Sequence, residues 1–393
     1  MQGAVAQKEK EIFFWQQRLQ QDPQNFVYLT ELGGLYLNLF KLKGTIEDLK
    51  TGDSLLKTAA SRLNHADPEM LHTLSQVAIT QHQFKQAAEY IEEAHDNNSA
   101  PFVHALLSFD VAMELGVYRE AKGALNVIKD QTSFNYLIRK AKYQDHLGDL
   151  EGAINLMEAA FANVAQTNNN PLYCWALSNL GDMYGHAGRI NEAYAAYLQV
   201  LKRDPAYTYA LKGIAWIAFS HDKNTKEAKR ILKYIESTTQ SPDVYLTLAE
   251  IAEYEAAPAE KKEYIRHFLT EATRPEYDNM YNTALIQIYT EETMNLEKAE
   301  QLALQEVQQR PTPETYSWLA WVAFKKGAVQ EAYQLYNAHI KGRSFEPEVL
   351  LKAAYILEAA GKEKEAKKYF EECLASQFEL GPVQYNEIKE KAR

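Results

Sequence analysis

Apolar and small residues return every three or four positions through almost the whole chain, the spacing of one face of an α-helix. Leu29, Leu32, Gly33 and Tyr36 share such a face near the start. The same pattern recurs at Leu71, Leu74 and Ala78; at Leu177, Leu180 and Tyr184; at Leu211, Ile214 and Ala218; and at Tyr316, Leu319 and Ala323. The pattern predicts helices throughout and no strands.

A second kind of helix follows these first helices, and it carries a small residue with a large apolar residue four positions later. The pairs are Ala87/Ile91, Ala121/Leu125, Ala153/Met157, Ala193/Tyr197, Ala332/Tyr336 and Ala366/Phe370. The small residue lets two helix axes approach closely, and the large one fills the space beside them. Glycines fall between the two helices, where a left-handed turn is favoured: Gly148, Gly188, Gly327 and Gly361.

The helix pairs form a repeat. The segments GRINEAYAAY (188–197), GAVQEAYQLY (327–336) and GKEKEAKKYF (361–370) are alike, and Gly327 and Gly361 lie 34 positions apart. That spacing is typical of a helix–turn–helix repeat whose units stack. We expect about ten pairs, starting near residues 25, 68, 101, 133, 170, 206, 242, 277, 313 and 347.

The pattern divides the chain into three parts. Residues 1–24 are expected to form an N-terminal tail and a leading helix over Glu11–Gln21, residues 25–376 the repeat array, and residues 377–393 a C-terminal capping helix. One repeat cannot bury its apolar face alone, so each unit is expected to lean on its neighbours. The working surface of such an array is its curved trough.

The repeat resembles the tetratricopeptide repeat family. Leu177, Leu180, Gly181, Tyr184, Ala193, Tyr197 and Pro205 match its signature positions, and the resemblance spans residues 25–376. It implies an all-α, right-handed superhelical solenoid with capping helices at both ends. It also implies that first helices line a concave groove that holds a peptide or a partner's helix, and that the chain is not an enzyme.

Charge narrows the class of partner. The net charge is −11, so the chain lacks the attraction to phosphates that dominates nucleic-acid affinity. We therefore expect a protein or peptide partner and no nucleic acid. No apolar run is long enough to span a membrane. Cys174 and Cys373 lie about five repeats apart, too far for a disulfide, and are expected to be free thiols.

The N-terminus leaves the compartment open. Ala4-Val5-Ala6 has the small-x-small form of a signal-peptidase site, but no apolar stretch precedes it. One interpretation is a short disordered tail on a cytoplasmic protein. The other is the remnant of an export signal, which would place the protein in the periplasm or at the cell surface.

The sequence contains no catalytic, metal or cofactor signature. It has no HExxH, GxSxG or GxxxxGK[ST] motif, and its ten histidines are scattered. The carboxylate pairs, such as Glu291/Glu292, are expected on charged helix surfaces. We therefore predict no catalytic residue, no metal ligand and no cofactor.

Aromatic residues supply the candidate binding site. Ala215–Phe219 (AWIAF) and Ala320–Phe324 (AWVAF) are near copies in the same helical phase. The groove-facing candidates are Trp175, Tyr209, Lys212, Trp216, Phe219, Trp321, Phe324 and Tyr355. Aromatic anchors dominate many interfaces, but rings at helical spacing also serve as core between repeats. Both interpretations stay open.

Three functions are compatible with these patterns. The first is a non-enzymatic scaffold that binds a peptide or partner helix in the concave groove. The second is a structural homo-oligomer that assembles through the repeat surface. The third is an enzyme whose site is built from scattered residues without a motif.

Overall fold

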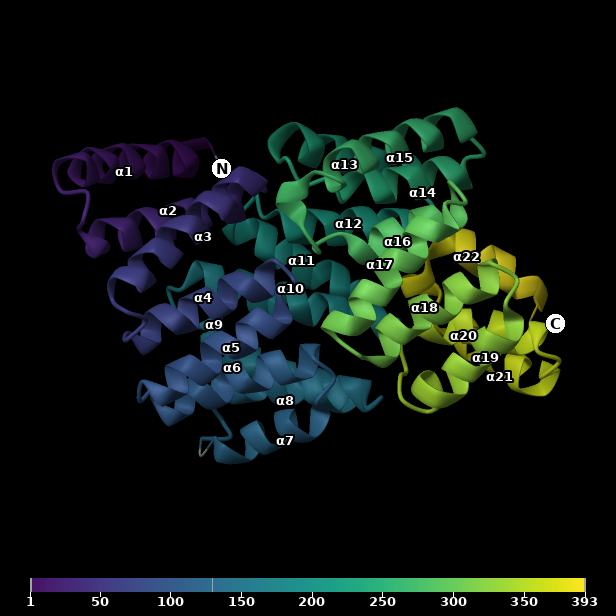
Figure 1. Cartoon of the computed structure of the whole chain (residues 1–393). Helices are drawn as coiled ribbons and strands as arrows, with labels where there is room; N and C mark the ends of the chain where they lie inside the picture. The colour runs from purple at the N-terminus through teal and green to yellow at the C-terminus, as the bar shows by residue number, and fades with distance from the viewer. Residues whose placement is uncertain (1, 129, 392–393) are drawn as a thin grey trace. The chain divides into compact units, whose positions relative to one another are not determined.

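The computed structural model describes residues 2–128 and 130–391. These residues form 22 α-helices, a 3₁₀ helix η1 (Pro275–Tyr277) and a π-helix η2 (Tyr336–Ile340), and they contain no strand. Figure 1 shows the helices as successive antiparallel pairs joined by short turns. The prediction of an all-α solenoid of helix–turn–helix repeats is confirmed.

Ten pairs lie between the first helix, α1 (Gln2–Gln21), and the last, α22 (Gln377–Lys391). Their bounds are α2 (Phe26–Lys43) with α3 (Ile46–Arg62), α4 (Pro68–Thr80) with α5 (Phe84–Asp96), α6 (Pro101–Glu114) with α7 (Tyr118–Val127), α8 (Phe134–His146) with α9 (Leu150–Ala165), α10 (Asn170–His186) with α11 (Ile190–Arg203), α12 (Thr208–Ser220) with α13 (Thr225–Thr238), α14 (Val244–Tyr254) with α15 (Pro258–Ala272), α16 (Asn282–Glu291) with α17 (Leu296–Gln309), α18 (Pro313–Lys325) with α19 (Val329–Leu335) and η2, and α20 (Pro347–Ala359) with α21 (Glu363–Ala375).

The predicted starts agree with these bounds to within a few residues. The largest difference is at α16, which begins at Asn282 rather than near residue 277. The reason is local: Pro275–Tyr277 forms η1, and Asp278 then adopts a positive φ of 49° that ends the turn.

Second helices bury the small and large residues that the pattern singled out. Ala193, Ala332 and Ala366 have almost no exposed surface, and the same holds for Tyr197, Tyr336 and Phe370. An alanine at each crossing lets the neighbouring backbone approach, and the ring fills the remaining space. The four predicted turn glycines, Gly148, Gly188, Gly327 and Gly361, all have positive φ.

Helix starts are fixed by side chains that satisfy free backbone N–H groups. Asp67 accepts a hydrogen bond from the Glu69 amide, and Pro68 occupies the first turn of α4. Thr312 and Thr315 exchange side-chain and backbone hydrogen bonds in a capping box at the start of α18. These caps explain why the Pro-marked boundaries could be predicted.

The N-terminal helix is longer than predicted. It begins at Gln2, so Ala4-Val5-Ala6 is helical and not a disordered tail. Lys8 and Gln7 both bond the Glu11 carboxylate, at 2.8 and 3.0 Å, one turn away. Val5 packs with the cluster formed by Ile12, Leu32, Leu35 and Leu39. The assignment of chain parts to residues 1–24, 25–376 and 377–393 stays a prediction.

The chain divides into two compact units. Unit 1 contains Met1–Val127, Ile235–Val244 and Thr270–Tyr281. Its three segments are joined by polar contacts: the Gln240 amide donates to the Lys43 carbonyl at 2.8 Å, Arg274 pairs with Glu47, and the Gln83 side chain donates to Asp278 at 2.8 Å. Tyr277 completes an apolar cluster around Leu56, Leu71, Leu74 and Ile91.

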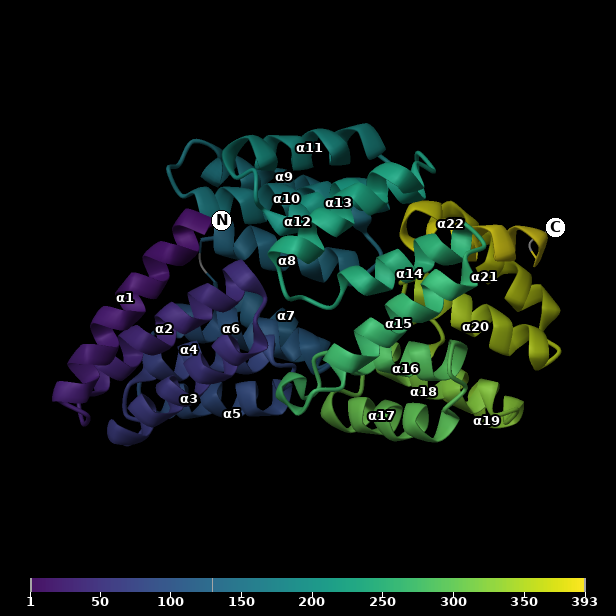
Figure 2. The same cartoon turned by 90° about the horizontal axis from the view of Figure 1, so that it is seen from above.

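Unit 2 contains Ile128–Tyr234, Tyr245–Leu269 and Asn282–Arg393. Within it, α22 contacts α20 and α21, which precede it, and also α10 and α12, far earlier in the chain. Figure 2 shows α22 in yellow beside α21 and α20. The expectation that each unit touches only its neighbours is therefore wrong for α22, and its physical cause is described below.

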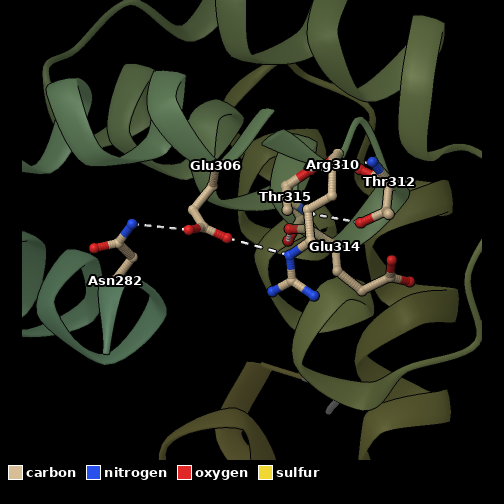
Figure 3. Close-up of polar contacts among 7 residues, drawn as sticks. Asn282, Glu306, Arg310, Thr312, Glu314 and Thr315 are labelled. Atoms are coloured by element: carbon tan, nitrogen blue, oxygen red, sulfur yellow. Dashed lines mark hydrogen bonds and ion pairs between the residues drawn. The ribbon is translucent and has the colours of Figure 1, made fainter. Parts of the chain in front are cut away.

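A buried polar network joins the pair α16–α17 to α18 (Figure 3). Glu306 is only 4% exposed. Its carboxylate accepts hydrogen bonds from Asn282 Nδ2 at 2.8 Å and from Arg310 Nε at 3.2 Å. The Thr312–Thr315 capping box follows directly, so the end of α17 and the start of α18 are held together.

Two further expectations concern the whole chain. Among the described residues, no helix combines the length and the apolar content that crossing a bilayer requires. Cys174 and Cys373 are both free and buried, as predicted.

The Glu306 network predicts a stability difference. Glu306→Ala removes the buried carboxylate to which Asn282 and Arg310 both donate, and we expect it to lower the free energy of unfolding by about 2–3 kcal/mol. The control is Glu372→Ala, which removes a largely exposed pair with Lys368 and should cost under about 0.5 kcal/mol. Urea denaturation followed by circular dichroism measures both. Equal losses in the two variants would contradict the structural role of Glu306.

Candidate functional site

The candidate residues lie on first helices of unit 2. Their environment is set by α22, which lies against α10, α12 and α20. We call the residues of α10, α12, α14 and α20 that face α22 the α22 contact surface; its members used below are Gly185, Trp216, Glu250 and Tyr355. The predicted residues fall into two groups, one on α10 and α12 and one on α18 and α20.

Trp216 is part of the α22 contact surface. Its indole Nε1 donates a hydrogen bond to the Phe378 carbonyl at 2.8 Å, across 162 positions of sequence. Its ring also meets Phe219 edge to face, with centroids 5.7 Å apart. Trp216 is half-buried, and the chain's own C-terminal segment contacts it.

Phe219 and Trp216 differ in role. Phe219 has 0% exposure, and its ring packs edge to face on Tyr254 of α14 at 5.7 Å. This arrangement fits the alternative interpretation, in which the ring is core between repeats.

Trp175 and Tyr209 are the exposed members of the set. They are 40% and 47% exposed, respectively, and lie one repeat length apart, at equivalent positions of α10 and α12. The Tyr209 hydroxyl donates to Asp182 Oδ2 at 2.5 Å, which ties α12 to α10. Trp175 meets Phe134 edge to face at 6.0 Å. Lys212, which follows Tyr209 on α12, is half-buried.

The second group is a cluster of three rings. Trp321 stacks on Phe324 with centroids 5.0 Å apart and meets Tyr355 at 5.8 Å. Trp321 Nε1 donates to Glu291 at 2.5 Å, and Lys325 binds the same carboxylate at 2.6 Å. All three rings are half-buried. The Tyr355 hydroxyl donates to Glu387 of α22 at 2.7 Å.

Sequence reasoning missed the residues that seat the C-terminal segment. Phe378 packs so close to Gly185 of α10 that a Cβ at Gly185 would lie 2.9 Å from the Phe378 Cζ atom. Gly185 stands at the repeat position that Phe219 and Phe324 fill in other pairs. The glycine in α10, at a position where α12 and α18 carry phenylalanine, is the sequence signal for this contact.

Gly381 is the second missed residue. Its φ of 72° and ψ of 170° interrupt α22. Residues other than glycine rarely adopt this backbone conformation. A Cβ there would lie 2.9 Å from Trp216 Cη2 and would also meet Glu250 Oε1. Gly381 and the following Pro382 are both buried. The backbone of this turn is thus pressed against the α22 contact surface.

Carboxyl groups gather around the same turn. Burial raises the pKa of Glu250 to about 8, with Glu253 and Glu348 adding to the effect and Lys223 opposing it. Glu250 Oε1 is buried and has no hydrogen-bond partner within the described part of the chain. An ionised carboxylate in this position would be both desolvated and unpaired, so the neutral acid is favoured.

The pKa values of Glu379 on α22 and of Glu346, which precedes α20, are also raised. Burial raises the pKa of Glu379 to about 8, and the carboxylates of Glu346, Asp145 and Glu348 raise it further. Burial likewise raises the pKa of Glu346 to about 7. The His186 ring lies 3.9 Å from the Glu379 carboxylate, and burial lowers the pKa of His186. The surroundings of the docked segment are therefore acidic and poorly neutralised.

Perturbed carboxyl groups often mark functional sites. Here the cause is packing, because α22 covers them. Among the described residues, no three His, Cys, Asp or Glu side chains are arranged to hold a metal ion. What the geometry provides is a surface that holds an aromatic side chain, a backbone carbonyl and a glycine turn.

Comparison with known proteins identifies the repeat. Residues 176–207 and 347–379 match the tetratricopeptide repeat family model. No curated protein sequence matches the chain. Among solved structures, a tetratricopeptide repeat protein from Parabacteroides merdae is 16% identical, covering 66% of this chain and 97% of its own, with a TM-score of 0.38.

Two further structures cover more of the chain. A chain of the APC/C hetero-tetramer Cut9–Hcn1 is 14% identical, covering 98% of this chain and 93% of its own, with a TM-score of 0.38. Human IFIT1, solved as a dimer with m7Gppp-AAAA, is 12% identical, covering 80% and 70%, with a TM-score of 0.51. At such identities the likeness to human IFIT1 concerns the fold alone.

The buried acids predict a pH-dependent stability. Between the ordinary value of 4.5 and about 8, folded Glu250 keeps a proton that the unfolded chain releases, so raising the pH destabilises the fold. Glu250→Gln cannot ionise. We expect it to raise the free energy of unfolding at pH 8.5 by on the order of 2 kcal/mol relative to wild type, with little change at pH 5.

The measurement is urea denaturation of both proteins at the two pH values. Exposed Glu371→Gln on α21 is the control and should leave the difference between the two pH values unchanged. A Glu250→Gln variant that loses as much stability as wild type between pH 5 and 8.5 would show that this carboxyl is ionised in the fold.

Proposed function

We propose that this tetratricopeptide repeat protein is a non-enzymatic scaffold. It binds a peptide or a partner's helix in the concave groove formed by first helices of unit 2. Proteins built from these repeats serve generally in protein–protein interaction, and the repeats carry that general role here. The groove, its anchors and the absence of catalysis are the parts we propose.

The exposed rings carry the proposal. Trp175 and Tyr209 present large aromatic surfaces from equivalent positions of adjacent repeats, and paired aromatic anchors contribute a large share of interface energy. Trp321, Phe324 and Tyr355 offer a second, half-buried aromatic surface, with Lys325 over the Trp321 ring. Lys212 lies on α12, as does Tyr209. Phe219 is left out because none of its side chain is exposed.

The proposed partner is a protein and not a nucleic acid. The net charge of −11 disfavours the phosphate contacts that nucleic-acid binding requires. An amphipathic or extended peptide needs no phosphate contact and gains from aromatic surface. The acidic surroundings also favour a partner segment with basic residues.

The anchor proposal is tested by a double variant, Trp175→Ala with Tyr209→Ala. Affinity capture from the native lysate, with quantitative mass spectrometry, identifies proteins bound by the wild type. We expect the double variant to recover them at least about tenfold less, since losing one aromatic anchor typically costs 2 kcal/mol or more.

The matched control is Phe102→Ala in unit 1, where the ring is 41% exposed, like that of Trp175. This variant should recover the same proteins as wild type. Equal recovery by a folded double variant would remove Trp175 and Tyr209 from the binding site.

Self-assembly is the second candidate function, and one observation favours it. Phe13 and Phe14 on α1 are 61% and 48% exposed, an apolar surface that a second copy would cover. In this case Phe13→Ser with Phe14→Ser should shift a dimer to monomer in sedimentation velocity. A wild-type chain that sediments as a monomer at millimolar concentration would exclude assembly.

A further inference from the structure

The first residues of α22 are bound by α10, α12 and α14 as a ligand would be bound. Three features of the segment Phe378–Pro382 are recognised: a ring, a carbonyl and a glycine turn. The ring lies against Gly185 and joins the apolar cluster of α8–α12 that includes Leu177, Leu180 and Tyr197. Gly185 leaves the space because its repeat lacks the phenylalanine found at this position in others.

The backbone contacts are equally specific. Trp216 Nε1 donates to the Phe378 carbonyl at 2.8 Å. Three residues later, the backbone turns at Gly381, whose φ is 72°. This turn lies against Trp216 and Glu250 and leaves no space for a side chain at position 381. Pro382 follows and is buried. Leu380, between Phe378 and Gly381, is buried in the apolar cluster of α18–α22. These contacts define a pattern: an aromatic residue, one residue of any kind, an apolar residue, then glycine and proline.

One residue of the segment suits this site poorly. Glu379 lies among Asp145, Glu346 and Glu348, and the His186 ring is 3.9 Å from its carboxylate. Like charges at an interface disfavour binding, and opposite charges favour it. A segment with lysine at this position would replace repulsion by attraction and keep every other contact.

We propose that this surface is a peptide-recognition site for a partner segment of the form aromatic–basic–apolar–Gly–Pro, and that Phe378–Pro382 of the chain itself occupies it as a weaker competitor. The inference rests on the proposed scaffold function and names its partner's chemistry. The partner must displace the segment, because both would use Gly185, Trp216 and the space beside Gly381.

The two halves of α22 make such an exchange feasible. Beyond Gly381, Ile388 is fully buried in the cluster of α18–α22, and Lys391 pairs with Glu358 at 2.6 Å. Displacing Phe378–Pro382 therefore leaves the second half of α22 on α20. The glycine interruption separates the segment that is exchanged from the part that remains.

The test uses fluorescent peptides and the full-length chain. The reference peptide is SQFELGPVQYN, copied from residues 376–386, and the basic peptide is SQFKLGPVQYN. Fluorescence anisotropy gives the Kd for wild type and for Gly381→Ala, whose own segment no longer fits. We expect Gly381→Ala to bind the reference peptide at least about tenfold tighter than wild type, because the internal competitor is removed.

Gly361→Ala is the matched control. Gly361 has φ of 71°, close to that of Gly381, but a Cβ there meets no atom within 4 Å. It carries the same backbone strain without the clash, so it should bind the peptide as wild type does. Phe378→Ala is a second way to empty the site without backbone strain and should reproduce the gain. Circular dichroism confirms that each variant is folded.

Peptide specificity completes the test. The basic peptide should bind about tenfold tighter than the reference to both proteins, whereas SQFELAPVQYN, which replaces the glycine, should not bind. In the wild type, excess basic peptide should accelerate hydrogen exchange of the amides at 378–381 and leave those near Ile388 protected. No peptide binding to folded Gly381→Ala and Phe378→Ala, or basic and reference peptides of equal affinity, would overturn the proposal.

The outcomes separate this inference from the scaffold function. If the peptides fail but partner capture still depends on Trp175 and Tyr209, the scaffold function stands and the recognition pattern is wrong. If the peptides bind as expected but no captured protein depends on those two anchors, the recognition site stands and the anchors are wrong.

Discussion

No helix pair in this chain can bury its apolar face by itself, and that constraint organises the structure. Several second helices present an alanine where the next helix crosses and a large apolar side chain beside it, as with Ala332 and Tyr336 or Ala366 and Phe370. The chain continues from the pair α20–α21 into α22, which covers that pair with Leu380 and Ile388, both buried. The first role of α22 is thus to cover the apolar face of the pair α20–α21.

Most of the fold was predictable because its signals are local. Periodicity, turn glycines and proline-marked starts placed nearly every first helix within a few residues, and α18 begins at the expected Pro313. The candidate site was only partly predictable. The repeated AWIAF and AWVAF segments make Trp216 a candidate, but its contact with Phe378 joins residues 162 positions apart, and periodicity carries no information on such a pair. Phe219 and Phe324 share one repeat position, yet only Phe219 is fully buried, because Tyr254 packs on it.

Opposing contributions act on the segment that α22 lays across α10 and α12. The Phe378 ring and the hydrogen bond from Trp216 favour docking. Glu250 and Glu379 oppose docking. Burial and neighbouring carboxyl groups raise the pKa of each to about 8. A cap selected for stability alone would be expected to carry an apolar residue at position 379, since replacing buried charge by apolar groups is often stabilising. The acidic residue instead makes the occupied state weaker than the site allows.

The weaker docking is confined to the first turn of α22. Gly381 divides α22 into a first turn that contacts α10, α12 and α14 and a second part that stays on α20 through Ile388, Glu387 and Lys391. Capping also uses Leu380, which belongs to the first part and is buried. The other contacts of the first turn reach a distant repeat, where Gly185 stands at the position that Phe219 and Phe324 occupy in α12 and α18. Since stacking does not require those contacts, their specificity is better explained by recognition, with the chain's own turn holding the site until a more complementary segment arrives.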